Sequence, residues 1–257
     1  TLLFNMLEAV ELNANRKNGD LKLYEFGNCY FYDAEKRSEE CPTAAYSEEY
    51  RLAMAVTGTA QPASWNAKPV KASFFTLRAM AEKLLRRFGI DIYALKAETL
   101  HDDLLSEALS MTLGNKELLR IGAVGAKVRR ALGVKQEVFY LEMNFDALVR
   151  STKKHRIAVE ELSKFPEVKR DLALLVDREV TFSALRDAAF AAERKLLKSV
   201  SLFDVYEGDK LPEGKKSYAL NFVLEDKTRT LDDRTIERVM AALARQFEQR
   251  CGAQVRC

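Results

Sequence analysis

The sequence predicts an α+β protein with two domains: an antiparallel sheet flanked by a helix, and then a compact βαββαβ unit. Three observations support this prediction. The chain has 257 residues, 47% of them hydrophobic, which suffices for about two domains with separate cores. Within the first 150 residues, several strand patterns follow one another with few helices between them. Beyond residue 164, strand and helix patterns alternate in a compact order.

The chain opens with a predicted helix from Leu2 to Leu12, whose apolar residues recur at helical spacing, and Asn18-Gly19-Asp20 ends it with turn residues. The aromatic segment from Leu21 to Asp33 has no helical period and indicates one long strand or a pair of strands. From Arg51 to Thr59, apolar and other side chains alternate. This pattern predicts a strand that is buried on one face only.

A loop from Gln61 to Pro69 surrounds Trp65, which we expect to be a packing anchor. Ser73 is placed to cap a helix that Gly89 ends. Two further strands are predicted from Leu118 to Val124 and from Glu137 to Phe145. Between them, GAVGAK at 122–127 lacks the spacing of a phosphate-binding loop, so we interpret it as two strands that meet at a tight turn.

A polar segment from Asp146 to Lys164, which includes Lys153-Lys154-His155-Arg156, is the predicted domain boundary. The elements expected beyond it are a strand at 170–177, a helix at 182–196, strands at 200–206 and 217–224, a helix at 232–249 capped by Asp232 or Asp233, and a short strand at 253–256. This βαββαβ order is that of the split βαβ sandwich of ferredoxin-like domains.

Composition excludes several classes of protein. The net charge of +3 argues against a polybasic RNA-binding arm or membrane-surface protein, and no apolar run is long enough for a membrane span. The four cysteines form no C-x-x-C pair and there are two histidines, so we expect reduced thiols and no standard zinc site. His101-Asp102-Asp103 is interpreted as a solvated turn rather than a metal site. No catalytic motif indicates an autonomous enzyme.

The second predicted domain carries the polar residues that could bind RNA. Its candidate cations are Lys169, Arg170, Lys215, Lys216, Lys227 and Arg229, and its strands hold Phe203, Tyr206, Tyr218 and Phe222. Rings stack on unpaired bases and cations follow the phosphates. The alternative stays open, because half of the rings must face the core by strand alternation. In addition, 18 basic against 16 acidic residues make this part of the chain barely positive.

Four strings in register carry a resemblance to a known family: FPEVKRDLAL at 165–174, LFDVYEG at 202–208, LPEGKKS at 211–217 and TRTLDD at 228–233, followed by GAQVR at 252–256. They resemble the ferredoxin-fold anticodon-binding domain of bacterial phenylalanyl-tRNA synthetase β subunits. NANRKNGDLKLYEFG at 13–27 is similar to the preceding, class II synthetase-like domain of that family. One departure is HDDLLS at 101–106, where the family has a Pro-Gly-Arg-Ser-Ala-like run.

The resemblance implies a partial, catalytically inactive class II synthetase-like domain at 1–150 and an anticodon-binding domain at 164–257. It implies no catalytic residue and no metal in this chain. ATP, Mg²⁺ and phenylalanine would be handled by the α subunit of an α2β2 enzyme in the cytoplasm. The sequence agrees with this expectation. A class II site binds ATP phosphate through arginines on two strands, but here Asn28 and Cys29 follow Glu25-Phe26-Gly27, and the Gly-x-Gly-x-Glu-Arg string of the second strand is missing. Because the chain starts at Thr1, we expect it to be the C-terminal part of such a subunit.

Residue roles follow from the same resemblance. Phosphate contacts are expected from Lys169, Arg170, Lys216 and Arg229, and base stacking or base-edge hydrogen bonds from Tyr206, Ser217, Tyr218 and Asn221. Asp171 and Asp204 are expected to hold Arg170 or loop backbone in place. Alternation does not decide which face of the sheet meets the tRNA. The alternative function is a protein-interaction scaffold without direct RNA contact.

Overall fold

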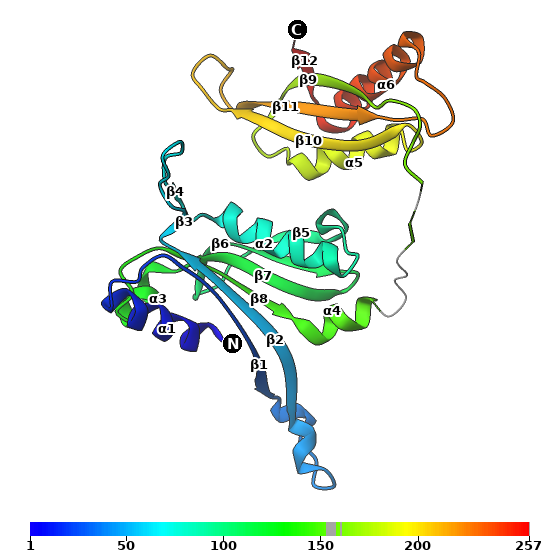
Figure 1. Ribbon diagram of the computed structural model, residues 1–257. Helices are drawn as coiled ribbons and strands as arrows, with labels where there is room; N and C mark the ends of the chain where they lie inside the picture. Colours follow the sequence, from blue (N-terminus) through cyan, green and yellow to red (C-terminus); the bar gives the residue numbers. More distant parts are fainter. Residues whose placement is uncertain (153–157, 160, 257) are drawn as a thin grey trace. The chain divides into compact units, whose positions relative to one another are not determined.

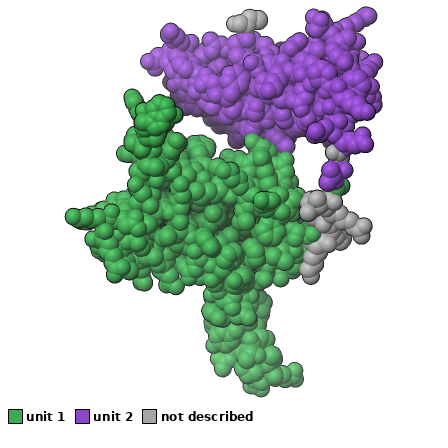
Figure 2. Space-filling view, in the orientation of Figure 1, with its two compact units in different colours: residues 1–158 green, residues 159–257 purple. Residues whose placement is uncertain are grey.

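The structure is a computed structural model that describes residues 1–152, 158, 159 and 161–256 (Figure 1). The chain divides into two compact units, residues 1–158 and residues 159–257 (Figure 2). This division falls within the predicted boundary segment at 146–164, whose first residues belong to α4 (Phe145–Thr152) of the first unit, where Leu148 is fully buried. The basic run from Lys153 to Arg156, and also Cys257, lie outside the described residues.

The first unit is built on an antiparallel sheet, as predicted, and this sheet has six strands. Its strands, in spatial order, are β1 (Leu21–Tyr32), β2 (Tyr46–Thr57), β8 (Val138–Asn144), β7 (Lys116–Val124), β6 (Leu105–Leu113) and β5 (Lys96–Leu100). β1 is one long strand, because every residue of it pairs with β2. β5 and β6 were not predicted; the pairing of β6 with β7 contains two irregularities that break the period of two.

Helices cover both faces of this sheet (Figure 1). On one face pack α1 (Leu3–Asn15) and α3 (Ala126–Ala131), and on the other pack α2 (Phe74–Arg87) and α4. The prediction of a strand buried on one face only is therefore wrong for β2. Leu52 contributes to the core under α2, and Ala53 to the core under α1. Because alanine side chains are small, a strand face made of alanines carries a weak hydrophobic signal, and the sequence alone does not show that this face is buried.

Short elements complete the first unit. A small antiparallel pair is formed by β3 (Thr59–Gln61) and β4 (Val70–Lys71), and 3-10 helices span η1 (Ala34–Lys36), η2 (Pro42–Ala45) and η3 (Ile92–Ala94). Trp65, between β3 and β4, is 97% exposed, so the expectation of a packing anchor is wrong. The expectation of two strands at 122–127 is also wrong, since Gly125 links β7 to α3. His101 lies in an exposed turn between β5 and β6, as predicted.

The start of α2 confirms the predicted cap. The Ser73 hydroxyl accepts a hydrogen bond from the Thr76 amide at 3.3 Å, and the Thr76 hydroxyl accepts one from the Ser73 amide at 3.2 Å. We expect Ser73→Ala to lower the unfolding free energy of the first unit by about 1 kcal/mol. Ser73→Asp keeps an acceptor and is the control. Urea denaturation followed by circular dichroism measures both, and equal losses would contradict the capping role.

The second unit has the predicted βαββαβ order. Its elements are β9 (Val168–Asp177), α5 (Phe182–Ala192), β10 (Leu197–Tyr206), β11 (Lys215–Leu224), α6 (Asp233–Cys251) and β12 (Gln254–Arg256). The strands form one antiparallel sheet in the order β10-β11-β9-β12. Asp232 caps α6 by accepting from the Thr235 amide at 2.6 Å.

One face of this second sheet is covered and the other is not. α5 and α6 pack on the side that carries Leu174, Leu220 and Phe222, and the Phe222 ring lies 5.9 Å from the ring of Phe247 in α6. None of the described helices packs against the opposite side of this sheet. A two-layer sandwich of this kind leaves a full sheet surface open to a ligand.

Candidate functional site

The helix-free face of the second unit comprises the side chains that alternate with the buried ones. Cross-strand pairing places them in rows. Tyr206, Ser217, Leu175 and Gln254 form one row, and Asp204, Ala219, Ala173 and Arg256 form the next. Farther along the face, Ser201, Asn221 and Asp171 form a third row, with Lys169 beyond it. Aromatic, hydroxyl, amide and cationic groups thus share one surface.

Strand alternation divides the eight residues predicted to bind tRNA. Lys169, Tyr206, Ser217 and Asn221 lie on the helix-free face. Arg170, Lys216 and Tyr218 point to the side that carries α5 and α6, and Arg229 lies in the loop between β11 and α6. Along β11 the six residue steps from Ser217 to Val223, the partner of Lys169, span about 20 Å. The structure therefore gathers half of the predicted set on one surface.

Tyr218 and Lys216 are buried on the side of β11 that faces the helices. Tyr218 is only 7% exposed; its hydroxyl donates to the Val180 carbonyl at 3.4 Å, and the Lys216 ammonium lies 4.6 Å from its ring centroid. A buried ring cannot stack on a base, and the buried Lys216 is occupied with the ring. Both residues lie on this side because the even-numbered residues of β11 face the helices. Arg170 is on the same side, but it is exposed at the rim beside Phe222.

The expected role of Asp171 as a support for Arg170 is also corrected. Asp171 accepts a hydrogen bond from the Asn221 amide at 2.6 Å, across the β9–β11 pair, while the Arg170 guanidinium donates to the Lys169 carbonyl at 3.0 Å. Asn221 is thereby held in one orientation on the helix-free face. Asp204 pairs with Ala219 on that face, as part of its surface.

Arg229 is attached to its own loop. Its guanidinium lies 3.4 Å from the Asp226 carboxylate, which also accepts from the side chain and the backbone amide of Thr228. These Thr228 hydrogen bonds, and then Arg229, hold the pKa of Asp226 below its ordinary value. Arg229 itself is exposed. It can reach a phosphate without leaving the loop.

Tyr206 is positioned by a glycine. A Cβ atom on Gly208 would lie 2.2 Å from the Tyr206 hydroxyl oxygen and 2.3 Å from the ring carbon that bears it. The hydroxyl end of the Tyr206 ring thus occupies the space that a side chain at position 208 would fill, so a larger residue there would displace the ring. Tyr206 remains 40% exposed. The hydroxyl end of the ring lies against Gly208 while part of the ring stays open to a ligand.

Sequence reasoning missed three features of this face. Ala173 and Ala219 lie opposite each other and form a flat floor beside Tyr206 and Ser217, and Arg256 of β12 faces Ala173. Phe203 is the extra residue of a β-bulge in β10 and is largely exposed. The pairing of β12 with β9 and the bulge are not readable from local patterns, although the GAQVR string did mark the segment.

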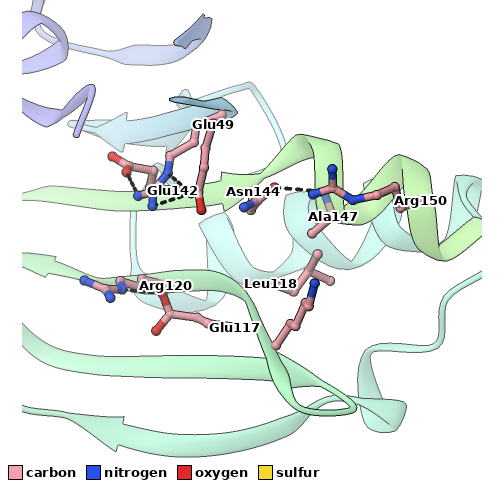
Figure 3. A pocket seen from close by; sticks show the side chains of 10 residues that line it. Glu49, Glu117, Leu118, Arg120, Glu142, Asn144, Ala147 and Arg150 are labelled. Carbon is pink, nitrogen blue, oxygen red and sulfur yellow. Dashed lines mark hydrogen bonds and ion pairs between the residues drawn. The ribbon is translucent and has the colours of Figure 1, made fainter. Parts of the chain in front are cut away.

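The first unit has a polar pocket of about 330 Å³ that is lined by residues of β2, β7, β8 and α4 (Figure 3). Its charged lining residues are Glu49, Arg51, Lys116, Glu117, Arg120, Glu142 and Arg150. Arg51 bonds to Glu142 and also to Glu49 at 2.7 Å, and Arg120 bonds to Glu117 at 2.6 Å. The inner arginines are therefore neutralised by the chain itself.

Glu142 is the centre of a buried network. Besides Arg51, its carboxylate accepts from the Thr1 hydroxyl at 2.5 Å, the Tyr140 hydroxyl at 2.6 Å and the Leu2 amide at 3.0 Å. Burial alone would raise the pKa of Glu142, but these hydrogen bonds outweigh it and lower the pKa to about 2. Burial and then the Glu142 charge raise the pKa of Tyr140. The network fastens the start of α1 to β8.

Within the described ranges, no group of three or more His, Cys, Asp or Glu side chains is arranged to hold a metal ion. Cys29, Cys41 and Cys251 are free thiols. No helix of the described part of the chain is long and apolar enough to cross a membrane.

Comparison with known proteins gives two family matches along the chain. Residues 1–145 match the family model described as the phenylalanyl tRNA synthetase beta chain CLM domain. Residues 163–256 match the family model described as the ferredoxin-fold anticodon binding domain.

The chain belongs to the phenylalanyl-tRNA synthetase beta chain family.

Curated relatives agree with this assignment. The chain is 45% identical over all its 257 residues to the phenylalanine–tRNA ligase beta subunit of Bacteroides fragilis, and 41% identical to that of Porphyromonas gingivalis. Identity to the beta subunit of Geobacillus kaustophilus is 33% over 96% of the chain. The chain covers about 31% of the first relative's length and 30% of the last. This beta chain sequence thus corresponds to about a third of its relatives.

Among solved structures, this beta chain resembles pyrrolysyl-tRNA synthetase from Desulfitobacterium hafniense, with a TM-score of 0.41 and 15% identity over 63% of the chain and 54% of that structure. A likeness this distant does not establish a class II architecture for the first unit. The anticodon-binding match, in contrast, spans the whole helix-free face of the second unit, from Lys169 to Arg256.

Proposed function

We propose that this beta chain is a non-catalytic part of phenylalanine–tRNA ligase in the cytoplasm. Residues 1–150 would be an inactive class II synthetase-like domain that packs against the α subunit of an α2β2 enzyme. Residues 164–257 would bind the anticodon stem-loop of phenylalanine tRNA through the helix-free face. The observation that carries the proposal is the gathering of Tyr206, Ser217, Asn221 and Lys169 on that face, within the segment that matches anticodon-binding domains.

The chemistry of the face suits unpaired RNA. Tyr206 offers a partly exposed ring on which a base can stack, for about 1–3 kcal/mol. Ser217 and the oriented Asn221 amide are suited to base edges, although Ser217 is buried beside Tyr206 and would be reached only at the rim. Lys169 and Arg256 provide cations for the phosphates at separate points of the surface.

The pocket of the first unit supports the non-catalytic assignment. An ATP phosphate needs arginines whose forks are free, but Arg51 and Arg120 are each bonded to carboxylates. These two arginines therefore do not fit an ATP phosphate. We therefore assign phenylalanine activation, and the ATP and Mg²⁺ that it uses, to the α subunit.

Binding of an anticodon hairpin of phenylalanine tRNA tests the proposal. We expect Lys169→Ala to weaken binding and to reduce the slope of log affinity against log salt by about 0.7, the value for one phosphate contact on a single strand. Arg170→Ala is the matched control, because this neighbouring cation lies on the side of the helices. We expect it to leave affinity and slope unchanged. Fluorescence anisotropy of labelled hairpin at several salt concentrations gives both quantities.

Two outcomes would count against this function. Loss of binding with Arg170→Ala but not with Lys169→Ala would place the RNA on the other side of the sheet. Absence of salt-dependent binding by the unmodified chain would favour the alternative, a protein-interaction scaffold without direct RNA contact. A hairpin with a different anticodon loop serves as the specificity control.

A further inference from the structure

The hairpin of β1 and β2 carries a row of exposed aromatic side chains. We define the aromatic row as Tyr24, Phe26, Tyr30 and Tyr32 of β1 with Tyr46 and Tyr50 of β2. The β1–β2 register places all six on one face of the hairpin. Tyr24, Tyr30 and Tyr46 are 72%, 75% and 65% exposed. From Tyr24 to Tyr32 the row extends about 27 Å.

One part of the aromatic row contacts the core of the first unit, and the rest extends away from it. Next to Tyr24 in the row, the Phe26 ring stacks on Tyr50, with 5.8 Å between the ring centroids, and contacts the Phe145 ring of α4 at 4.9 Å. Beyond that point the hairpin projects from the body of the first unit (Figure 2). At the outer end Tyr32 and Tyr46 contact only each other among the described rings, at 5.1 Å. An apolar patch of this length is typical of a protein interface.

The charge of the hairpin restricts the partner. Residues 24–50 hold seven carboxylates and two cations. Such a segment repels RNA phosphates and anionic lipid headgroups. It also repels a second copy of itself, which would bring equal charges together. The surface that complements it is a protein surface with an apolar centre and a basic rim.

The backbone of β1 supports the same conclusion. β1 is an edge strand of twelve residues without proline, and none of the described strands pairs with its outer side. Soluble proteins normally protect such edges or use them to bind an extended segment. The aromatic row and the free edge lie on the same strand, so one partner can contact both.

We propose that the aromatic row is the docking surface for the α subunit of the ligase, through an apolar α-subunit surface rimmed by lysine or arginine. This inference rests on the proposed function, in which α is the partner of the first unit. It adds the surface and the chemistry of the contact. Tyrosine is among the residues that contribute most binding energy in protein interfaces.

Photo-crosslinking in the assembled ligase identifies the occupant of the row. Tyr30→p-benzoylphenylalanine is introduced into the β chain at its natural length, co-expressed with α. The matched control is Trp65→p-benzoylphenylalanine, since Trp65 is at least as exposed as Tyr30 but lies outside the hairpin. We expect an α–β product at Tyr30 at least about tenfold above that at Trp65. A product within β or between two β chains would overturn the proposal.

Affinity provides the second measurement. Tyr30→Ser with Tyr46→Ser is expected to weaken the α–β complex about 10- to 100-fold, because two exposed rings of the interface are lost. Phe75→Ser, an exposed ring on α2, is expected to leave the affinity unchanged. Unchanged affinity in the Tyr30 and Tyr46 variant would overturn the docking surface. If the unmodified chain forms no complex with α, the proposed function itself fails.

Discussion

Glu142→Ala is expected to destabilise the first unit by about 3–5 kcal/mol, the usual cost of removing one partner from a buried ion pair. The change leaves Arg51 without its buried carboxylate. It also removes the acceptor of the Tyr140 hydroxyl, the Thr1 hydroxyl and the Leu2 amide. Urea denaturation followed by circular dichroism measures the loss.

Two further variants serve as comparisons for Glu142→Ala. Glu142→Gln keeps an oxygen acceptor, so we expect a smaller loss of about 1–3 kcal/mol. Glu98→Ala removes a carboxylate from an exposed pair with Lys96 on the same sheet and is expected to change stability by less than about 1 kcal/mol. Equal effects of Glu142→Ala and Glu98→Ala would contradict the role of the network.

The same carboxylate gives the first unit a dependence on pH. The pKa of Glu142 is about 2 in the folded chain, below its ordinary value of 4.5. Its contribution is therefore present above pH 4.5 and is lost as the pH falls from there towards 2. The stability difference between the unmodified chain and Glu142→Ala is expected to shrink over this range. A difference that stays constant would contradict the low pKa.

Tyr206→Ala is expected to weaken binding of the anticodon hairpin by about 5- to 150-fold, which corresponds to 1–3 kcal/mol for one stacked base. Tyr206→Phe keeps the ring and is expected to bind within about twofold of the unmodified chain if stacking dominates. Anisotropy titrations measure both variants. Unchanged affinity in Tyr206→Ala would remove the stacking platform from the proposed interface.

Gly208→Ala tests the position of the ring without removing it. The added methyl group overlaps only the end of the Tyr206 side chain, so the ring must move while the backbone can stay. We expect unchanged circular dichroism and an affinity between those of Tyr206→Phe and Tyr206→Ala. In a Tyr206→Ala background, Gly208→Ala should have no further effect. An additional loss there would show that Gly208 acts in another way.

Local signals explain what the sequence predicted well. The Ser73 cap, Gly89 and the cap of α6 mark helix ends within a few residues, and the βαββαβ order follows from successive patterns of short range. Arg51 and Glu142 are 91 residues apart. Nothing local relates them, so the buried network could not be predicted.

Only part of the candidate site could be predicted, because its other residues also depend on contacts between distant parts of the chain. Alternation shows that Lys216 and Tyr218 share one side of β11, but not that α5 and α6 cover that side. Phe203 adds a residue to β10, which changes the alternation between Leu202 and Asp204. Trp65 failed as an anchor because the size of an apolar side chain alone does not determine its burial.

The exposure of Trp65 has a consequence for spectroscopy. It is the only tryptophan of the chain, and its indole already lies in water in the folded protein. Its emission wavelength should therefore barely change when the chain unfolds, and a melting curve recorded by this signal would report little. For the same reason, the emission wavelength of Trp65 should shift when a molecule binds against the β3–β4 tip and removes the indole from water.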